Sequence, residues 1–164
     1  ADEAAVPLVR FAKLLGFRTV VTDGRAAFAT RAKHPDADEV IAAWPDEVAT
    51  RVDVSDRTYV VSLNHEPRFE DAMLHALAGH EVAYIGAIGK RVRHLERVER
   101  AAAAGLDLSQ FPTIHTPIGL DIGGKSPEEI ALSIIAEIVA VKNGRPGGML
   151  VTPLETSALP QVSS

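Results

Sequence analysis

Residues 119–126 have the spacing of a phosphate-binding P-loop, because they read Gly-Leu-Asp-Ile-Gly-Gly-Lys-Ser. In such a loop the backbone amides surround the phosphates, the lysine contacts the terminal phosphates and the serine hydroxyl binds Mg²⁺. Here Asp121 would repel a triphosphate, and Pro112 and Pro117 disfavour the strand that must precede the loop. We therefore interpret Ser126 as the N-cap of a helix, and we keep a P-loop phosphohydrolase only as the second alternative function.

Gly86 and Gly89 form a second glycine-rich turn, between a predicted strand and a predicted helix. The cations Lys90, Arg91 and Arg93 follow it, and free amides at the start of a helix attract anions. Two glycines can equally serve close packing in a tight strand-to-helix turn. The sequence leaves both interpretations open. We interpret the charged run at 90–100 as a solvated helix face.

Three polar residues stand where predicted strands or loops could present them to a ligand. Asp23 follows a short apolar run, and an acid at the end of the second strand of a dinucleotide-binding fold bonds the ribose hydroxyls. His65 is a candidate for acid–base chemistry or a ligand contact, or else a turn residue. Asp121 is expected either to bond local backbone amides or to face a ligand pocket. We expect these residues and the two glycine turns to surround one crevice at the carboxyl edge of a sheet.

The elements that must position these residues alternate between short β-rich runs and amphipathic helices. This alternation predicts a Rossmann-like three-layer α/β domain with a mostly parallel sheet over residues 1–144, followed by a C-terminal tail at 145–164. The predicted helices are 7–15, 45–50, 67–77, 90–104 and 126–143, and the predicted strands are 17–21, 39–44, 58–63, 81–85 and 113–115.

The first strand of that fold and its glycine loop are expected to be missing from this chain. The glycine turn stands about 20 residues before the ribose-binding acid, so counting back from Asp23 places it at or before residue 1. The chain also begins without Met, and we interpret it as a fragment. A lost central strand would leave the strands on either side of it unpaired, and another segment is expected to fill the gap.

Composition excludes several classes of function. The net charge of −5 and the pI near 5.7 disfavour a nucleic-acid or membrane surface. The chain has no Cys, which excludes disulfides and thiolate ligands. The histidines at 34, 75, 80 and 94 lack metal-ligand spacing, and we interpret them as surface residues. No apolar run is long enough to span a membrane and no secretory signal is found, so we predict a cytoplasmic protein.

Four motifs taken together resemble the C-terminal Rossmann domain of the XdhC/CoxI family, the accessory factors of xanthine dehydrogenase and related molybdenum hydroxylases. The resemblance covers residues 4–144. The motifs are Asp23 with Arg-Ala-Ala-Phe-Ala-Thr at 25–30, Asn-His-Glu-Pro at 64–67, Tyr-Ile-Gly-Ala-Ile-Gly at 84–89, and Pro-Ile-Gly-Leu-Asp-Ile-Gly at 117–123 with Pro-Glu-Glu-Ile-Ala at 127–131.

The resemblance implies a non-catalytic module that helps to bind molybdenum cofactor (molybdopterin) and deliver it to an apo-enzyme such as xanthine dehydrogenase. It also implies a nucleotide-type ligand site at the carboxyl edge of the sheet. An NAD(P)-dependent oxidoreductase is the first alternative, with His65 as the candidate proton donor. The site residues that the resemblance implies are Asp23, Arg25, His65, Gly86, Gly89, Gly119, Asp121 and Gly123, with no metal ligand.

Two departures from the family pattern limit what the resemblance implies. The N-terminal XdhC/CoxI domain with its Cys-containing motif, an expected partner within the same protein, is absent from the sequence. Asp2 and Glu3 would also lie near the expected pyrophosphate position, where negative charge is unfavourable. The sequence leaves open the ligand, the target enzyme and whether the protein forms a homodimer.

Overall fold

The protein is an α/β domain with parallel strands, described here from a computed structural model that covers residues 2–90 and 92–150. Arg91 and residues 151–164 of the predicted tail lie outside the described residues. In chain order the elements are α1 (Asp2–Leu14), β1 (Val20–Thr22), β2 (Glu39–Ile41), α2 (Pro45–Ala49), β3 (Tyr59–Ser62), α3 (Pro67–Leu77), β4 (Tyr84–Ala87), α4 (Val92–Ala103), the 3₁₀ turn η1 (Leu108–Gln110), β5 (Ile114–His115) and α5 (Pro127–Lys142).

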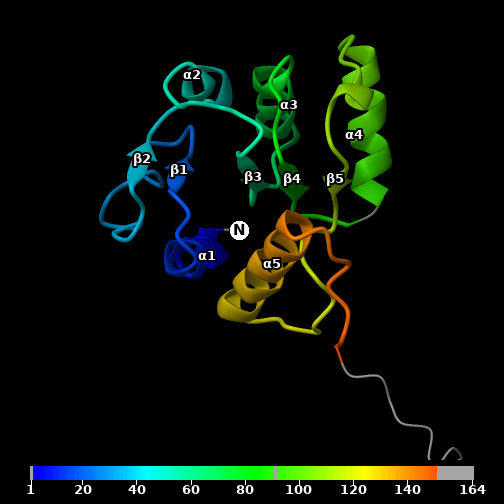
Figure 1. The fold of residues 1–164 in the computed structure, drawn as a ribbon. Helices are drawn as coiled ribbons and strands as arrows, with labels where there is room; N and C mark the ends of the chain where they lie inside the picture. The colour runs from blue at the N-terminus through cyan, green and yellow to red at the C-terminus, as the bar shows by residue number, and fades with distance from the viewer. Residues whose placement is uncertain (1, 91, 151–164) are drawn as a thin grey trace, which may run out of the picture.

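The strands form two parallel sheets that stand side by side. β1 pairs with β2, and β3, β4 and β5 pair in that order. Figure 1 shows the five strands in one row, in the order β2, β1, β3, β4 and β5. Within the described residues no strand pairs with the edges of β1 and β3 that face each other.

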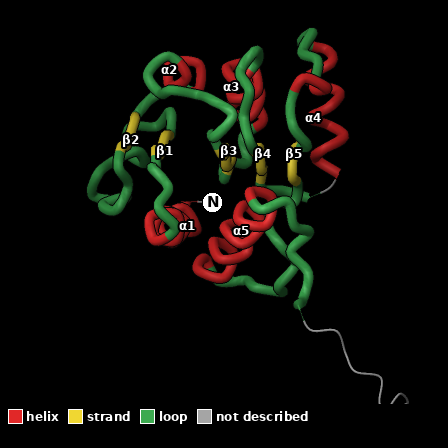
Figure 2. The backbone as a smooth tube through the Cα atoms, in the orientation of Figure 1, coloured by secondary structure: helices red, strands yellow, loops and turns green. Residues whose placement is uncertain are grey.

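Helices cover both faces of this row, which confirms the predicted three-layer, Rossmann-like architecture. α2, α3 and α4 lie on one side of the strands and α1 and α5 on the other, as Figures 1 and 2 show. None of the helices in the described part of the chain is long and apolar enough to cross a membrane.

Each face of the larger sheet has its own apolar core, because successive strand residues point to opposite faces. Ile85 of β4 joins the cluster under α3, whereas Tyr84 joins the cluster under α1 and α5. The first cluster consists of Met73, Leu74, Leu77, Val82, Ile85 and Phe111, and the second of Tyr84, Ile134, Ile135 and Ile138 with Leu8, Phe11, Tyr59 and Val61 packed against it.

Local signals set several helix ends where the sequence predicts them. α5 starts at a complete capping box, in which the Ser126 side chain accepts from the Glu129 N–H and Glu129 in turn accepts from the Ser126 N–H. α3 occupies the predicted range 67–77 and is followed by Gly79 at a φ of +80°. These confirmed ends depend on residues close in sequence.

Other boundaries differ from the prediction. α1 begins at Asp2, so that Pro7 lies inside the helix rather than at its start. The strand predicted at 17–21 is displaced to Val20–Thr22, because Phe17 belongs to the helix end: its N–H donates to the Ala12 carbonyl across Gly16, which has a φ of +80°. β4 is likewise later than predicted, at Tyr84–Ala87 instead of 81–85.

Candidate functional site

Three of the eight predicted site residues follow the carboxyl ends of strands. Asp23 follows β1, His65 lies three residues after β3, and Gly89 lies two residues after β4. In an open α/β sheet this edge is where ligands bind.

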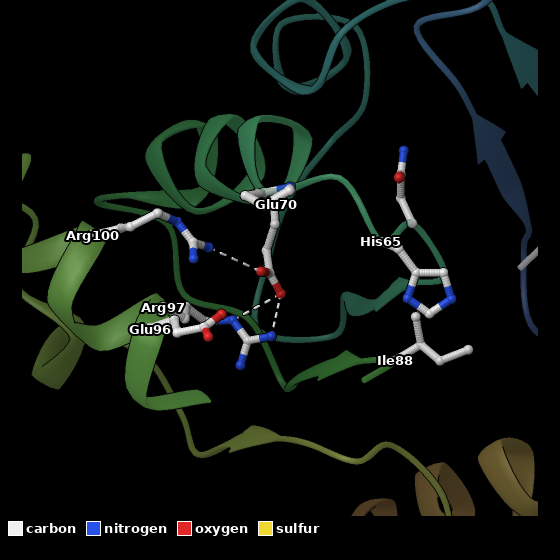
Figure 3. Close-up of a pocket in the computed structure, with 8 residues that line it drawn as sticks. His65, Glu70, Ile88, Glu96, Arg97 and Arg100 are labelled. Atoms are coloured by element: carbon white, nitrogen blue, oxygen red, sulfur yellow. Dashed lines mark hydrogen bonds and ion pairs between the residues drawn. The ribbon is translucent and has the colours of Figure 1, made fainter. Parts of the chain in front are cut away.

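A cavity of about 300 Å³ opens at the ends of β3 and β4, between α3 and α4. Figure 3 shows His65 and Ile88 close together on one side and the two arginines of α4 on the other. The structure therefore brings His65 next to Ile88 of the turn after β4, whereas Gly86 and Gly89 do not line this cavity. The lining residues are Asn64, His65, Pro67, Glu70, Ile88, Glu96, Arg97 and Arg100.

Carboxylates hold both arginines of this cavity. Arg97 is 1 % exposed; its Nε donates to Glu70 Oε1 at 2.8 Å and its Nη2 donates to the same oxygen. Arg100 donates through Nε to Asp71 at 3.0 Å and through Nη2 to Glu70 at 3.3 Å. The interpretation of 90–100 as a solvated helix face is wrong for Arg97, because Glu70 from α3 draws its guanidinium inward. A buried charge of this kind is retained only when it is paired.

The loop before α3 holds His65 at the mouth of the cavity. The Asn64 Oδ1 accepts the N–H of Glu66 at 2.8 Å, a local turn that leads directly into Pro67 at the start of α3. The Asn64 amide nitrogen can still donate to a ligand. His65 is exposed, so its ring is accessible from solvent.

Arg25 forms an ion pair with Asp23, the acid that the sequence predicts to bind a ribose. Asp23 accepts from the Arg25 N–H at 2.9 Å, from Nε at 2.9 Å and from Nη2 at 2.7 Å. These hydrogen bonds outweigh burial and hold the pKa of Asp23 below its usual value. The Arg25 guanidinium also lies 4.0 Å from the centroid of the Phe28 ring. Asp23 does not line the cavity, and a ribose would have to displace Arg25 to reach it.

Trp44 is a site candidate that the sequence analysis missed. It is 43 % exposed, packs against Phe69 of α3 with the ring centroids 5.7 Å apart, and covers Gly24 so closely that a Cβ there would lie 3.0 Å from Nε1. Its ring therefore bridges the end of β1 and α3 at the carboxyl edge. The signal was available, because this single tryptophan follows a β-rich run and precedes a helix-starting Pro45.

The turn after β4 is made by Gly89 and not by Gly86. Gly89 has a φ of +136°, a conformation that favours glycine, whereas Gly86 lies inside β4. A Cβ on Gly86 would lie 2.4 Å from Ile118 Cδ1 and 2.6 Å from the Tyr84 hydroxyl. Of the two interpretations left open by the sequence, close packing applies to Gly86.

Three amides of the P-loop-like segment at 119–126 donate to side chains of α5. The N–H groups of Lys125 and Ser126 donate to Glu129 Oε2 at 2.9 and 3.0 Å, and the Gly119 N–H donates to Glu137 Oε2 at 2.8 Å. A phosphate would have to displace these carboxylates. The geometry thus favours the N-cap interpretation of Ser126 over a phosphate-binding loop.

Gly119, Asp121 and Gly123 lie outside the cavity between α3 and α4. Asp121 is exposed and accepts no hydrogen bond within the described residues, so the structure supports neither its bonding to local amides nor a place in this cavity. Gly119 and Gly123 have φ values of +102° and +73°, which turn the chain back onto α5. Their role here is to shape the loop.

Glu137 of α5 forms a buried polar hub that no sequence motif indicates. Its carboxylate accepts from the Tyr84 hydroxyl at 2.6 Å and from the Gly119 N–H at 2.8 Å, and it lies 3.0 Å from His115 Nδ1. Burial alone would raise the pKa of Glu137, but these hydrogen bonds outweigh burial and hold it below its usual value. Burial and the neighbouring carboxylate raise the pKa of Tyr84.

No group of three or more His, Asp or Glu side chains in the described ranges is arranged to hold a metal ion. His34, which we interpreted as a surface residue, is 7 % exposed.

Comparisons with known proteins agree with the fold and the resemblance. The sequence model of the XdhC Rossmann domain matches residues 1–138. A relative from Bacillus subtilis (strain 168), named as a probable xanthine dehydrogenase subunit, is 31 % identical over 137 residues, which are 84 % of this chain and 39 % of the relative. A "Molybdenum cofactor insertion chaperone PaoD" from Escherichia coli (strain K12) is 25 % identical over 99 residues, or 60 % of this chain and 30 % of that protein.

A solved structure shares the fold. The crystal structure of a xanthine dehydrogenase from Bacillus halodurans superposes with a TM-score of 0.73 at 32 % identity, and the match covers 87 % of this chain and 42 % of that one. The chain spans about two fifths or less of the length of these proteins. From the match over residues 1–138, this chain belongs to the XdhC Rossmann-domain family.

Proposed function

We propose that this domain serves an accessory factor of a molybdenum hydroxylase, and that it helps to bind molybdenum cofactor and deliver it to the apo-enzyme. The relatives support this role by their names, since one is called a probable subunit of xanthine dehydrogenase and another a molybdenum cofactor insertion chaperone. The observation that carries the proposal is the cavity at the ends of β3 and β4, at the edge where open α/β sheets bind ligands.

The cavity suits the heterocyclic part of such a ligand. Its volume of about 300 Å³ lies at the lower end of the range for small-molecule sites, which is enough for a pterin ring. Asn64 and His65 offer donors and acceptors to the edge of a ring, and Ile88 offers an apolar surface to its face.

The phosphate of the cofactor finds no unpaired arginine among those that line the cavity. Glu70 and Asp71 already neutralise Arg97 and Arg100, the two guanidinium groups of the cavity. To bind here, a phosphate would have to replace a carboxylate as the partner of one of these arginines. Arg100 is the more accessible of the two, because 31 % of its side chain is exposed against 2 % for Arg97. We therefore assign Asn64 and His65 to the ring and Arg100 to the phosphate.

The test measures the pterin bound to the complete natural polypeptide, purified from cells that make molybdopterin and oxidised to release a fluorescent pterin. We expect His65→Ala and Asn64→Ala to lower the bound pterin roughly tenfold, which corresponds to about 1.4 kcal/mol of binding free energy. His80→Ala is the matched control, because His80 is an exposed loop histidine after α3 that does not line the cavity. It should leave the pterin content unchanged.

Two results would decide against the proposal. Equal pterin content in wild type, His65→Ala and Asn64→Ala would show that this cavity is not the site. Saturable NAD(P)H binding and hydride transfer, without bound pterin, would favour the oxidoreductase alternative.

A further inference from the structure

Glu96 of α4 lines the cavity but accepts no hydrogen bond within the described part of the chain. Glu70, the other carboxylate of the lining, accepts from Arg97 through one oxygen and from Arg100 through the second. Glu96 precedes Arg100 by four residues, so both side chains project from the same face of α4. Figure 3 shows Glu96 on the side of the cavity where the arginines lie, away from His65.

The charges beside Glu96 restrict what can bind there. Three carboxylates stand near two guanidinium groups, namely Glu70, Asp71 and Glu96 near Arg97 and Arg100. Arg100 is hydrogen-bonded to Asp71, and the charges of Asp71, Glu70 and Glu96 also act on it, so its pKa is raised although burial opposes the rise. A phosphate beside Glu96 would be repelled by its carboxylate, and a ligand ammonium group would be repelled by the two arginines.

A ligand that fills the cavity must also replace the water that hydrates Glu96. Glu96 is exposed, and an ionised carboxylate can only accept hydrogen bonds. A ligand that covered it without offering donors would leave the charge desolvated and unpaired, which is unfavourable. Neutral N–H groups satisfy the carboxylate without adding a positive charge beside the arginines. Two parallel N–H groups suit it best, because each carboxylate oxygen then accepts one hydrogen bond.

We propose that Glu96 binds the amino–imino edge of a 2-amino-4-oxopyrimidine ring, the ring that pterins and guanine share. In this ring the exocyclic amino group and the neighbouring ring N–H point in parallel, so that one carboxylate accepts from both. The Asn64 amide nitrogen, whose carbonyl oxygen already accepts from Glu66, is the matching donor for the ring carbonyl. The inference makes Glu96 a residue that determines specificity, and it rests on the proposed function for the identity of the ring as a pterin.

The test compares probes that differ only in the 2-amino group, titrated into the complete natural polypeptide and followed by calorimetry. One pair is 6-hydroxymethylpterin and its 2-oxo analogue 6-hydroxymethyllumazine, and the other is guanosine and inosine. We expect wild type to bind the pterin about tenfold more tightly than the lumazine, because the analogue replaces a donor to the carboxylate by an acceptor.

Two variants separate the Glu96 carboxylate from the general charge of α4. Glu96→Gln should reduce the preference for the pterin to about twofold or less, because a neutral amide offers only one acceptor atom. Glu99→Gln is the matched control, since Glu99 is an exposed carboxylate on the same helix that does not line the cavity. It should keep the wild-type preference.

Equal binding of the two members of each pair by wild type, or a preference that Glu96→Gln retains, would overturn this inference. The pterin content of the purified protein could then still depend on His65, and the proposed function would survive. A preference for guanosine over inosine that Glu96→Gln abolishes, without binding of the pterin, would support the role of Glu96 and contradict the proposed cargo. Failure of all four probes to bind would overturn the assignment of this edge.

Discussion

At the scale of single residues, the Glu137 carboxylate contacts polar groups of three different residues. This carboxylate accepts hydrogen bonds from the Tyr84 hydroxyl and the Gly119 N–H and lies against the His115 ring. The Glu137 side chain is only 14 % exposed. These partners come from β4, from the loop after β5 and from β5 itself. The group therefore ties α5 to the larger sheet, and its loss would leave a buried tyrosine hydroxyl without a partner.

Replacing this carboxylate should destabilise the fold markedly. We expect Glu137→Ala to lower the free energy of unfolding by about 2–4 kcal/mol, because the buried Tyr84 and two partly buried residues, His115 and Gly119, lose their partner at once. Glu128→Ala, an exposed position on the same helix, is the control and should cost no more than about 0.5 kcal/mol. Urea denaturation followed by circular dichroism measures both. If Glu137→Ala lowered the free energy of unfolding no more than Glu128→Ala does, Glu137 would not tie α5 to the sheet as described.

At the scale of elements, Asp38 links the end of α1 to the starts of both strands of the smaller sheet. Its carboxylate accepts from the Thr19 N–H at 2.7 Å and the Thr19 hydroxyl at 3.0 Å, and it pairs with Lys13 of α1. The hydrogen bonds from Lys13 and Thr19 lower the pKa of Asp38 to about 2. A folded-state pKa below the unfolded value of 3.8 means that this contribution is present above pH 3.8 and is lost as the pH falls towards 2.

Asp38→Asn should therefore reduce the acid sensitivity of the protein. We expect the Tm of wild type to fall more steeply than that of Asp38→Asn between about pH 4 and pH 2, because the variant has no carboxylate to protonate. Asp53→Asn, at an exposed carboxylate without a hydrogen bond in the described residues, should keep the wild-type profile. Parallel acid profiles for wild type and Asp38→Asn would contradict the assignment.

Elements whose signals are local could be predicted from the sequence, whereas contacts between elements could not. The capping box of Ser126 and the Pro67 start of α3 depend on neighbouring residues, and both were predicted. The burial of Arg97 depends on Glu70, which is 27 positions away, whereas the run of charges around Arg97 predicted a solvated face. For the site, the sequence placed His65 and the turn after β4 at the same edge, but only Ile88 of that turn lines the cavity with His65, and Trp44 was missed.

At the scale of the whole molecule, Phe17 joins the two halves of the strand row. Its ring meets Tyr59 of β3 edge-on, with the centroids 5.4 Å apart, and Lys142 at the end of α5 lies 5.2 Å from the ring centroid. Phe17 itself belongs to the turn that leads from α1 to β1. Since β1 and β3 share no backbone hydrogen bond in the described chain, side chains such as this one hold the halves together.

Removal of the Phe17 ring should lower the stability of the whole domain. We expect Phe17→Ala to cost about 2–4 kcal/mol in urea denaturation, below the full value for a buried phenylalanine because the ring is only partly buried. Leu14→Ala is the control, since Leu14 is 83 % exposed and should cost less than about 0.5 kcal/mol. A loss for Phe17→Ala no larger than that for Leu14→Ala would contradict this role of the Phe17 ring.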